Sequence, residues 1–198
     1  YGQQHIGNMR AAVFSDTVAR VLIGAGYRVH RVTNITDVGH LVDDGDDGED
    51  KMTVGARREK TTPETIAARY TKIYLKDLAE LNIDVETILF PRATEYIKEQ
   101  IALAKTLEEK GLTYLLSDGL YFDTKKFPSY GRLGGRSEVK LEAGARVAVV
   151  KGKHSSADFV LWRIARPHDL QQWDSPWGRG NPGWHIECSA MSRSLLGQ

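Results

Sequence analysis

Four residues near the start of the chain, His5, Ile6, Gly7 and Asn8, combine hydrogen-bonding side chains with a glycine. Apolar residues recur every three or four positions after them, which predicts a helix that ends near 24–26. A helix start offers backbone N–H groups and a partial positive charge, and glycine lets a ligand approach the backbone. His5 and Asn8 can both donate hydrogen bonds. The stretch therefore suits a nucleotide phosphate, although the same residues could serve only as a helix cap.

The elements around this stretch predict how it would be positioned. Residues 27–35 alternate and are rich in β-branched side chains, which indicates a strand. Together with an incoming strand that ends near Tyr1, it would form a βαβ unit whose parallel strands are crossed by the helix after Asn8. Ligands bind at the carboxyl ends of such strands, and both His5 and Thr36 fall at that edge. Taken alone, Thr36 could simply cap a turn.

The rest of the chain predicts three more helices and a β-rich segment. Thr62 and Pro63 mark a helix start, and a second helix follows Thr94 and stops at Lys110-Gly111. The apolar faces of both helices are interpreted as core rather than as ligand contacts. Several further elements are expected: a hairpin over 114–122 turning at Asp118-Gly119, short strands at 147–150 and 159–162, and a last helix from 186 onward.

Composition narrows the class of protein. The chain has 198 residues, a formal net charge of +1 and one cysteine, so no internal disulfide can form and no bulk attraction to nucleic acid is visible. No apolar run approaches the ~18 residues of a membrane span. The acidic run 43–50 lacks the spacing of a calcium-binding EF-hand loop and is interpreted as a solvated loop.

Four motifs, in order along the chain, resemble those of cysteinyl-tRNA synthetases, which are class I aminoacyl-tRNA synthetases. Residues 5–8 resemble the HIGH signature, residues 34–37 and 173–178 also fit the family, and residues 182–191 read PGWHIECSAM, a stretch typical of it. The resemblance implies an α/β fold. This is the Rossmann-like nucleotide-binding fold of class I synthetases, a parallel sheet with helices, interrupted by a β-rich connective insertion and incomplete at both ends. Residues 1–112 would be the first half of the catalytic domain, 113–180 the insertion and 181–198 the start of the second half.

The same resemblance implies a function. The protein would be a cytoplasmic ligase that uses ATP, with Mg²⁺, to activate L-cysteine and then transfers it to tRNA(Cys). His5, Ile6, Gly7 and Asn8 would bind ATP, with His5 and Asn8 as the catalytic residues. Asn8 departs from the second histidine of HIGH, and the family's Lys-Met-Ser-Lys-Ser loop does not occur in these 198 residues. The fragment alone is expected to be inactive.

The resemblance also implies an amino-acid pocket and a metal. Thr36 and Trp184 would contact the amino acid, and Cys188 would be one of four Zn²⁺ ligands, the others lying outside this chain. Zinc binds a soft thiolate strongly and a hydroxyl weakly, which would separate cysteine from serine. Taken alone, a single cysteine is usually a small buried hydrophobe, and a tryptophan such as Trp184 is often core.

Two other functions fit parts of the same pattern. A paralogous ligase that joins cysteine to an amino-sugar would share the adenylation site and lack the tRNA step. A non-catalytic, tRNA-binding relative of the synthetases would have lost the Lys-Met-Ser-Lys-Ser loop. An anticodon-binding domain elsewhere in the full sequence would favour the synthetase.

Overall fold

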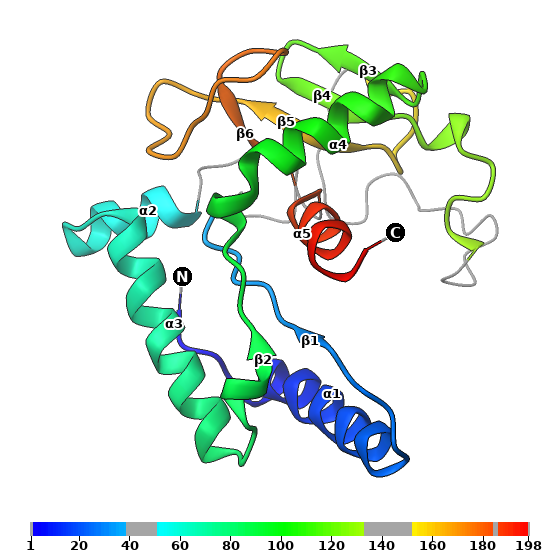
Figure 1. The fold of residues 1–198 in the computed structure, drawn as a ribbon. Helices are drawn as coiled ribbons and strands as arrows, with labels where there is room; N and C mark the ends of the chain where they lie inside the picture. The colour runs from blue at the N-terminus through cyan, green and yellow to red at the C-terminus, as the bar shows by residue number, and fades with distance from the viewer. Residues whose placement is uncertain (1, 39–50, 133–151, 184–185, 198) are drawn as a thin grey trace.

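The computed structural model describes residues 2–38, 51–132, 152–183 and 186–197 (Figure 1). The predictions for 43–50 and 147–150 lie outside them. The helices are α1 (Ile6–Gly24), α2 (Lys51–Glu59), α3 (Pro63–Glu80), α4 (Ile97–Glu109) and α5 (Ile186–Leu196). The strands are β1 (Arg31–Val32), β2 (Ile88–Leu89), β3 (Thr113–Leu116), β4 (Gly119–Phe122), β5 (Phe159–Ile164) and β6 (Gly180–Pro182). Short 3₁₀ turns are η1 (Val85–Thr87), η2 (Ala93–Tyr96) and η3 (Thr124–Lys126).

Strands β1 and β2 pair in parallel, with Arg31 opposite Ile88, and a further parallel bridge joins Ile35 to Arg92. Their connection passes through α2 and α3, since parallel strands need a long crossover. The α/β class is thus confirmed, but the strand expected over 27–35 shrinks to two paired residues. Residues 2–5 form no strand and Tyr1 lies outside the described part, so pairing before α1 stays a prediction.

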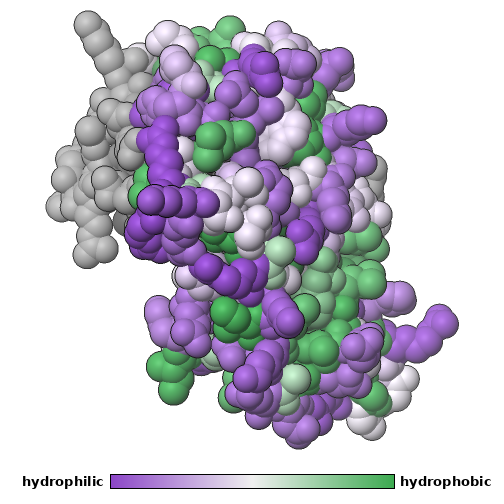
Figure 2. All heavy atoms as spheres, turned by 90° about the vertical axis from the view of Figure 1, so that its left-hand side faces the viewer, coloured by the Kyte–Doolittle hydropathy of each residue, from purple (hydrophilic) through white to green (hydrophobic). Residues whose placement is uncertain are grey.

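Helix α1 begins and ends where the sequence predicts, with His5 as N-cap, Ala25 as C-cap and Gly26 at a positive φ of 89°. Its apolar residues are mostly exposed, and only Met9, Asp16 and Ala19 are buried. Met9 joins a small apolar cluster with Leu78, Ile83 and Ile88. Figure 2 shows hydrophobic surface (green) at the height where Figure 1 places α1, α3 and β2.

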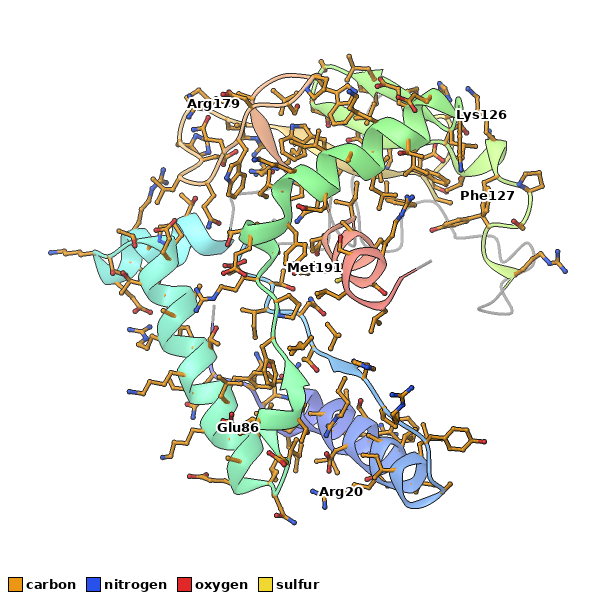
Figure 3. The ribbon with its side chains drawn as sticks, in the orientation of Figure 1. Arg20, Glu86, Lys126, Phe127, Arg179 and Met191 are labelled. Atoms are coloured by element: carbon orange, nitrogen blue, oxygen red, sulfur yellow. The ribbon has the colours of Figure 1, made fainter. Side chains whose placement is uncertain are left out.

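An ion pair helps to hold α1 to the strand that follows it. The Asp16 carboxylate lies 2.8 Å from Nη1 of Arg31 on β1 and 2.6 Å from Nε of Arg20. The hydrogen bond from Arg20 lowers the pKa of Asp16 against the opposing effect of burial, and Arg31 lowers it further. The remaining guanidinium contact of Arg20 reaches the Asn82 carbonyl just after α3, near the lower end of the molecule in Figure 3. The buried Asp16 carboxylate thus helps to hold α1 against β1, where few apolar side chains of α1 are buried.

The other predicted helix signals are also confirmed. Thr62 caps α3 by accepting a hydrogen bond from the Thr65 N–H, and Pro63 occupies the first turn, where its missing N–H costs nothing. Helix α4 ends at Lys110, and Gly111 follows at a φ of 69°, which favours glycine.

The four-stranded antiparallel sheet has the order β3-β4-β5-β6. The predicted hairpin forms, but its two-residue turn is Ser117 and Asp118 and not Asp118 and Gly119, because Gly119 already pairs with Leu116 as the first residue of β4. A Cβ on Gly119 would lie 2.5 Å from the Trp162 carbonyl oxygen, so the strands can approach only because this residue is glycine. The strand expected at 159–162 is β5 and the last helix is α5, both as predicted.

Helices α4 and α5 share one core with this sheet. Its buried members are Val38, Ala93, Ile97, Ala104, Leu120, Phe122, Leu161, Trp162, Ile186 and Met191. In Figure 1, α4 lies across the sheet and α5 lies below it, and Figure 3 places Met191 of α5 near the middle of the molecule. We call β3–β6, α4 and α5 the antiparallel part, and α1, β1, α3 and β2 the parallel part. No described helix is both long and apolar enough to cross a membrane.

Candidate active site

The start of α1 is closed by its own side chains. Nδ1 of His5 accepts a hydrogen bond from the Gly7 N–H at 3.0 Å, and Oδ1 of Asn8 accepts one from the His5 N–H at 3.2 Å. This is a capping box, in which two otherwise unpaired donors of the helix are satisfied reciprocally. A Cβ on Gly7 would lie 2.8 Å from Cε1 of His5, so any larger residue here would have to displace the imidazole ring.

The capping box changes which groups could face an anion. The expected open backbone N–H groups are partly occupied, because His5, Gly7 and Asn8 all use theirs within the first turn. Since Nδ1 of His5 is an acceptor, the proton of the neutral ring lies on Nε2, which can donate outward. The Nδ2 amide of Asn8 has no partner among the described residues. The anion donors at this helix start are therefore mainly side chains.

A pocket of about 450 Å³ lies beside this helix start and joins three segments of the chain. Its lining residues are Gly2, Gln3, Gln4, Asn8, Asn34, Ile35, Thr36, Asp37, Ala67, Tyr70, Thr71 and Tyr74. The structure thus brings together two of the predicted site residues, Asn8 and Thr36. His5 caps the same helix but is not among the lining residues.

Thr36 is held at the pocket by its neighbours. Its Oγ1 accepts a hydrogen bond from Nδ2 of Asn34 at 2.9 Å. The preceding residue, Ile35, pairs with Arg92, and the following residue, Asp37, is only 5% exposed. Both neighbours of Thr36 are thus fixed to the segment that leads into α4, so its hydroxyl has a defined position.

One wall of the pocket comes from α3, and two of its residues there, Tyr70 and Tyr74, were predicted only as core. Tyr70, Thr71 and Tyr74 of α3 face it, together with Ala67. Burial raises the pKa of Tyr74, whose ring packs edge-on against Phe90 at 6.5 Å. The signal that could have separated these residues from the core is their chemistry, because Tyr70, Thr71 and Tyr74 place three hydroxyls on neighbouring helix positions.

Cys188 lies in the first turn of α5, half-buried, and is not among the residues that line this pocket. Burial, and then the neighbouring Glu187 carboxylate, raise the pKa of its thiol above the ordinary value. Within the described residues, no group of three or more His, Cys, Asp or Glu could hold a metal ion. Zinc needs about four ligands, so the described residues do not form a zinc site by themselves. Trp184, the other predicted amino-acid contact, lies outside the described residues.

Comparison with known proteins covers the whole chain. Residues 1–198 match the model of the tRNA synthetases class I (C) catalytic domain. The chain is 51% identical over 200 residues to cysteine–tRNA ligase 1 of Burkholderia lata, 48% over 198 residues to the cysteine–tRNA ligase of Chlorobium luteolum, and 43% over 198 residues to that of Thermus thermophilus. Each alignment covers 100% of this chain and 41–42% of the relative. The chain belongs to the class I (C) tRNA synthetase catalytic domain family.

Proposed function

We propose that the full-length protein is a cysteine–tRNA ligase, which activates L-cysteine with ATP and transfers it to tRNA(Cys) in the cytoplasm. The observation that carries the proposal is the identity of 43–51% over the whole chain to relatives with that name. The pocket supports it, because Asn8 at the helix start and Thr36 after β1 line the same cavity. A helix start and a strand end are where a nucleotide and a small substrate can meet.

In the proposed reaction the cysteine carboxylate attacks the α-phosphorus of ATP. A carboxylate oxygen forms the new bond to phosphorus, and the α–β phosphoanhydride bond breaks as pyrophosphate leaves. His5 Nε2 and Asn8 Nδ2 would donate to phosphate oxygens, where charge builds up in the transition state, with Ile6 and Gly7 forming the backbone beside them. Thr36 would position the amino acid, and Mg²⁺ would accompany the nucleotide. Positioning and charge stabilisation supply most of the catalysis in such transfers.

We further propose Cys188 as one of four Zn²⁺ ligands, with the other three supplied by residues outside this chain. Bound zinc would supply selectivity for a thiolate over a hydroxyl. The half-buried thiol fits this assignment, since a soft ligand in partial shelter from water suits zinc. Trp184 is also proposed as an amino-acid contact.

ATP–pyrophosphate exchange on the full-length protein, with each of the twenty amino acids in turn, tests the function. We expect exchange with cysteine and little with serine, followed by charging of tRNA(Cys). Exchange with cysteine but no charging of tRNA would favour the amino-sugar ligase. No exchange with any amino acid would remove the enzymatic assignment.

Variants of His5 separate its two possible roles. His5→Ser keeps a side-chain cap and removes the imidazole, whereas His5→Ala removes both. If Nε2 contacts phosphate, both variants should slow exchange by about 10²–10³-fold, the usual effect of losing one such donor. If His5 is only a cap, His5→Ser should retain near-normal exchange and only His5→Ala should lose stability.

The metal assignment is tested by Cys188→Ser in the full-length protein. We expect loss of bound zinc and of cysteine-dependent exchange, because a hard hydroxyl replaces a soft thiolate. ATP binding, measured separately, should largely survive. Full zinc content and normal exchange in this variant would make Cys188 a packed thiol.

A further inference from the structure

A buried side chain from a distant loop holds the residue next to Thr36. Nε2 of Gln171, in the loop 165–179 between β5 and β6, donates a hydrogen bond to the Asp37 carbonyl at 3.0 Å across 134 positions of sequence. Gln171 is 6% exposed and Asp37 is 5% exposed, so water does not replace this bond. The contact therefore fixes the backbone of the Thr36-Asp37 segment directly.

The carboxylate of Asp37 is fixed from the other side. Oδ1 accepts a hydrogen bond from the Thr94 N–H at 2.9 Å, and Oδ2 accepts one from Thr94 Oγ1 at 2.6 Å. Thr94 is the second residue of the 3₁₀ turn η2, which leads into α4. Asp37 is thus bound by its side chain to the start of α4 and by its backbone to Gln171. Since Asp37 also lines the pocket, its position sets part of the pocket wall.

Gln171 is itself held by polar groups of the antiparallel sheet. Nδ2 of Asn181 on β6 donates to the Gln171 carbonyl at 3.4 Å, and Oδ1 of the same Asn181 accepts from Nε of Arg163 on β5 at 3.0 Å. Asn181 is 2% exposed and Arg163 is 8% exposed. A continuous chain of buried hydrogen bonds therefore runs from the sheet through Gln171 to the pocket.

We propose that Gln171 is a positioning residue that ties the loop 165–179 to the amino-acid side of the pocket through Asp37. It does not line the pocket, so it acts on substrate through the placement of Thr36. The inference rests on the proposed function for its substrate and on the structure alone for the link. Its consequence is that a change in the antiparallel sheet alters amino-acid binding more than ATP binding.

The test compares Gln171→Met with Gln172→Met in the full-length protein. Methionine matches glutamine in length but cannot donate. Nε2 of Gln172 donates to the Asp169 carbonyl at 2.8 Å within the same loop, so its loss perturbs the loop without touching Asp37. We expect Gln171→Met to raise the KM for cysteine about 5–10-fold, the usual effect of one lost buried hydrogen bond, with kcat and the KM for ATP within about twofold. Gln172→Met should leave all three within about twofold.

Backbone amide hydrogen exchange supplies a readout that needs no activity. In the ligand-free protein, Gln171→Met should speed exchange over 34–38, while Gln172→Met should leave this segment unchanged. Equal behaviour of the two variants in both assays, or equal rises in the KM for cysteine and for ATP, would overturn the proposal. If the wild-type protein activates no amino acid, the proposed function fails. In that case the amide hydrogen exchange of residues 34–38 alone decides whether Gln171 fixes the Thr36-Asp37 segment.

Discussion

Leu120, Tyr121 and Trp162 in the antiparallel part are at most 1% exposed, whereas Val13, Val18 and Val21 on α1 in the parallel part are at least 41% exposed. The antiparallel part has four paired strands and a large apolar core, and the parallel part has one pair of two-residue strands. The pocket lies in the parallel part. The pocket residues Asn8 and Thr36 thus sit in the part with the smaller apolar core, whereas Cys188 lies on α5 in the antiparallel part.

The difference shows what positions the pocket. In the parallel part, polar contacts replace many of the apolar contacts that a larger core would provide. They are the capping box of His5 and Asn8, the ion pair of Asp16 with Arg31, and the hydrogen bonds of Asp37. Hydrogen bonds and ion pairs depend on direction and distance, so they fix individual groups well but contribute modestly to stability. We therefore expect core substitutions in the antiparallel part to affect stability most, and polar substitutions in the parallel part to affect function most.

The largest expected effect comes from a matched pair of leucines. Leu120→Ala, at a position 1% exposed, should lower the free energy of unfolding by about 2–5 kcal/mol, because it leaves a cavity in the core. Leu22→Ala, at a position 39% exposed on α1, should change it by less than about 0.5 kcal/mol. Urea unfolding of both variants measures the change in the free energy of unfolding. Equal decreases in the two variants would show that the two parts do not differ in this respect.

A smaller effect is expected for Asp16→Asn, which removes the ion pair between α1 and β1. The free energy of unfolding should fall by about 1.5 kcal/mol at pH 7. This is at the low end for hydrogen bonds to a charged group, because Arg20 is half exposed and solvent screens its charge. Folding lowers the pKa of the Asp16 carboxyl group. The carboxylate therefore stabilises the folded protein above about pH 4, and this stabilisation is lost as the pH falls through the pKa of Asp16 in the folded state. Wild type and variant should converge in stability at low pH, and a difference that persists there would show that packing, not charge, is responsible.

The smallest effect is expected at the cap of α3. Thr62→Ala removes the acceptor for the Thr65 N–H and should lower the free energy of unfolding by about 1 kcal/mol. Thr62→Ser keeps the hydroxyl and should lower it much less. Thermal unfolding of the two variants measures this. Equal melting temperatures would mean that the apolar face of α3, and not its cap, fixes the helix start.

The local elements were predictable because their signals are local. Periodicity, caps and turn residues placed α1, α3 and α4 correctly and the hairpin with its turn one residue off, and Thr62 and Gly111 act as the sequence suggested. Long-range pairing was not predictable in the same way. Nothing near residues 27–35 indicates that only Arg31 and Val32 would form a strand, because the partner Ile88 lies over fifty positions away.

The candidate site could be predicted only in part for the same reason. Asn8 and Thr36 follow from motifs and share the pocket, but Tyr70 and Tyr74 were interpreted as core because a helical apolar face does not reveal what it faces. The surroundings of Gly7 could not be predicted either. The ring of His5 lies beside it, which depends on a rotamer that sequence does not encode, and a contact of Gly7 with ATP stays a prediction.

The most direct test of the pocket is amide hydrogen exchange of the full-length protein with and without ATP and cysteine. Segments 2–9 and 34–37 contain the predicted contacts, and segment 113–122 of the antiparallel sheet serves as an internal control. We expect slower exchange in both contact segments when both substrates are present, and no change in the control. Unchanged exchange at 2–9 and 34–37 while the protein is catalysing adenylation would place the substrates elsewhere and contradict the assignment of this pocket.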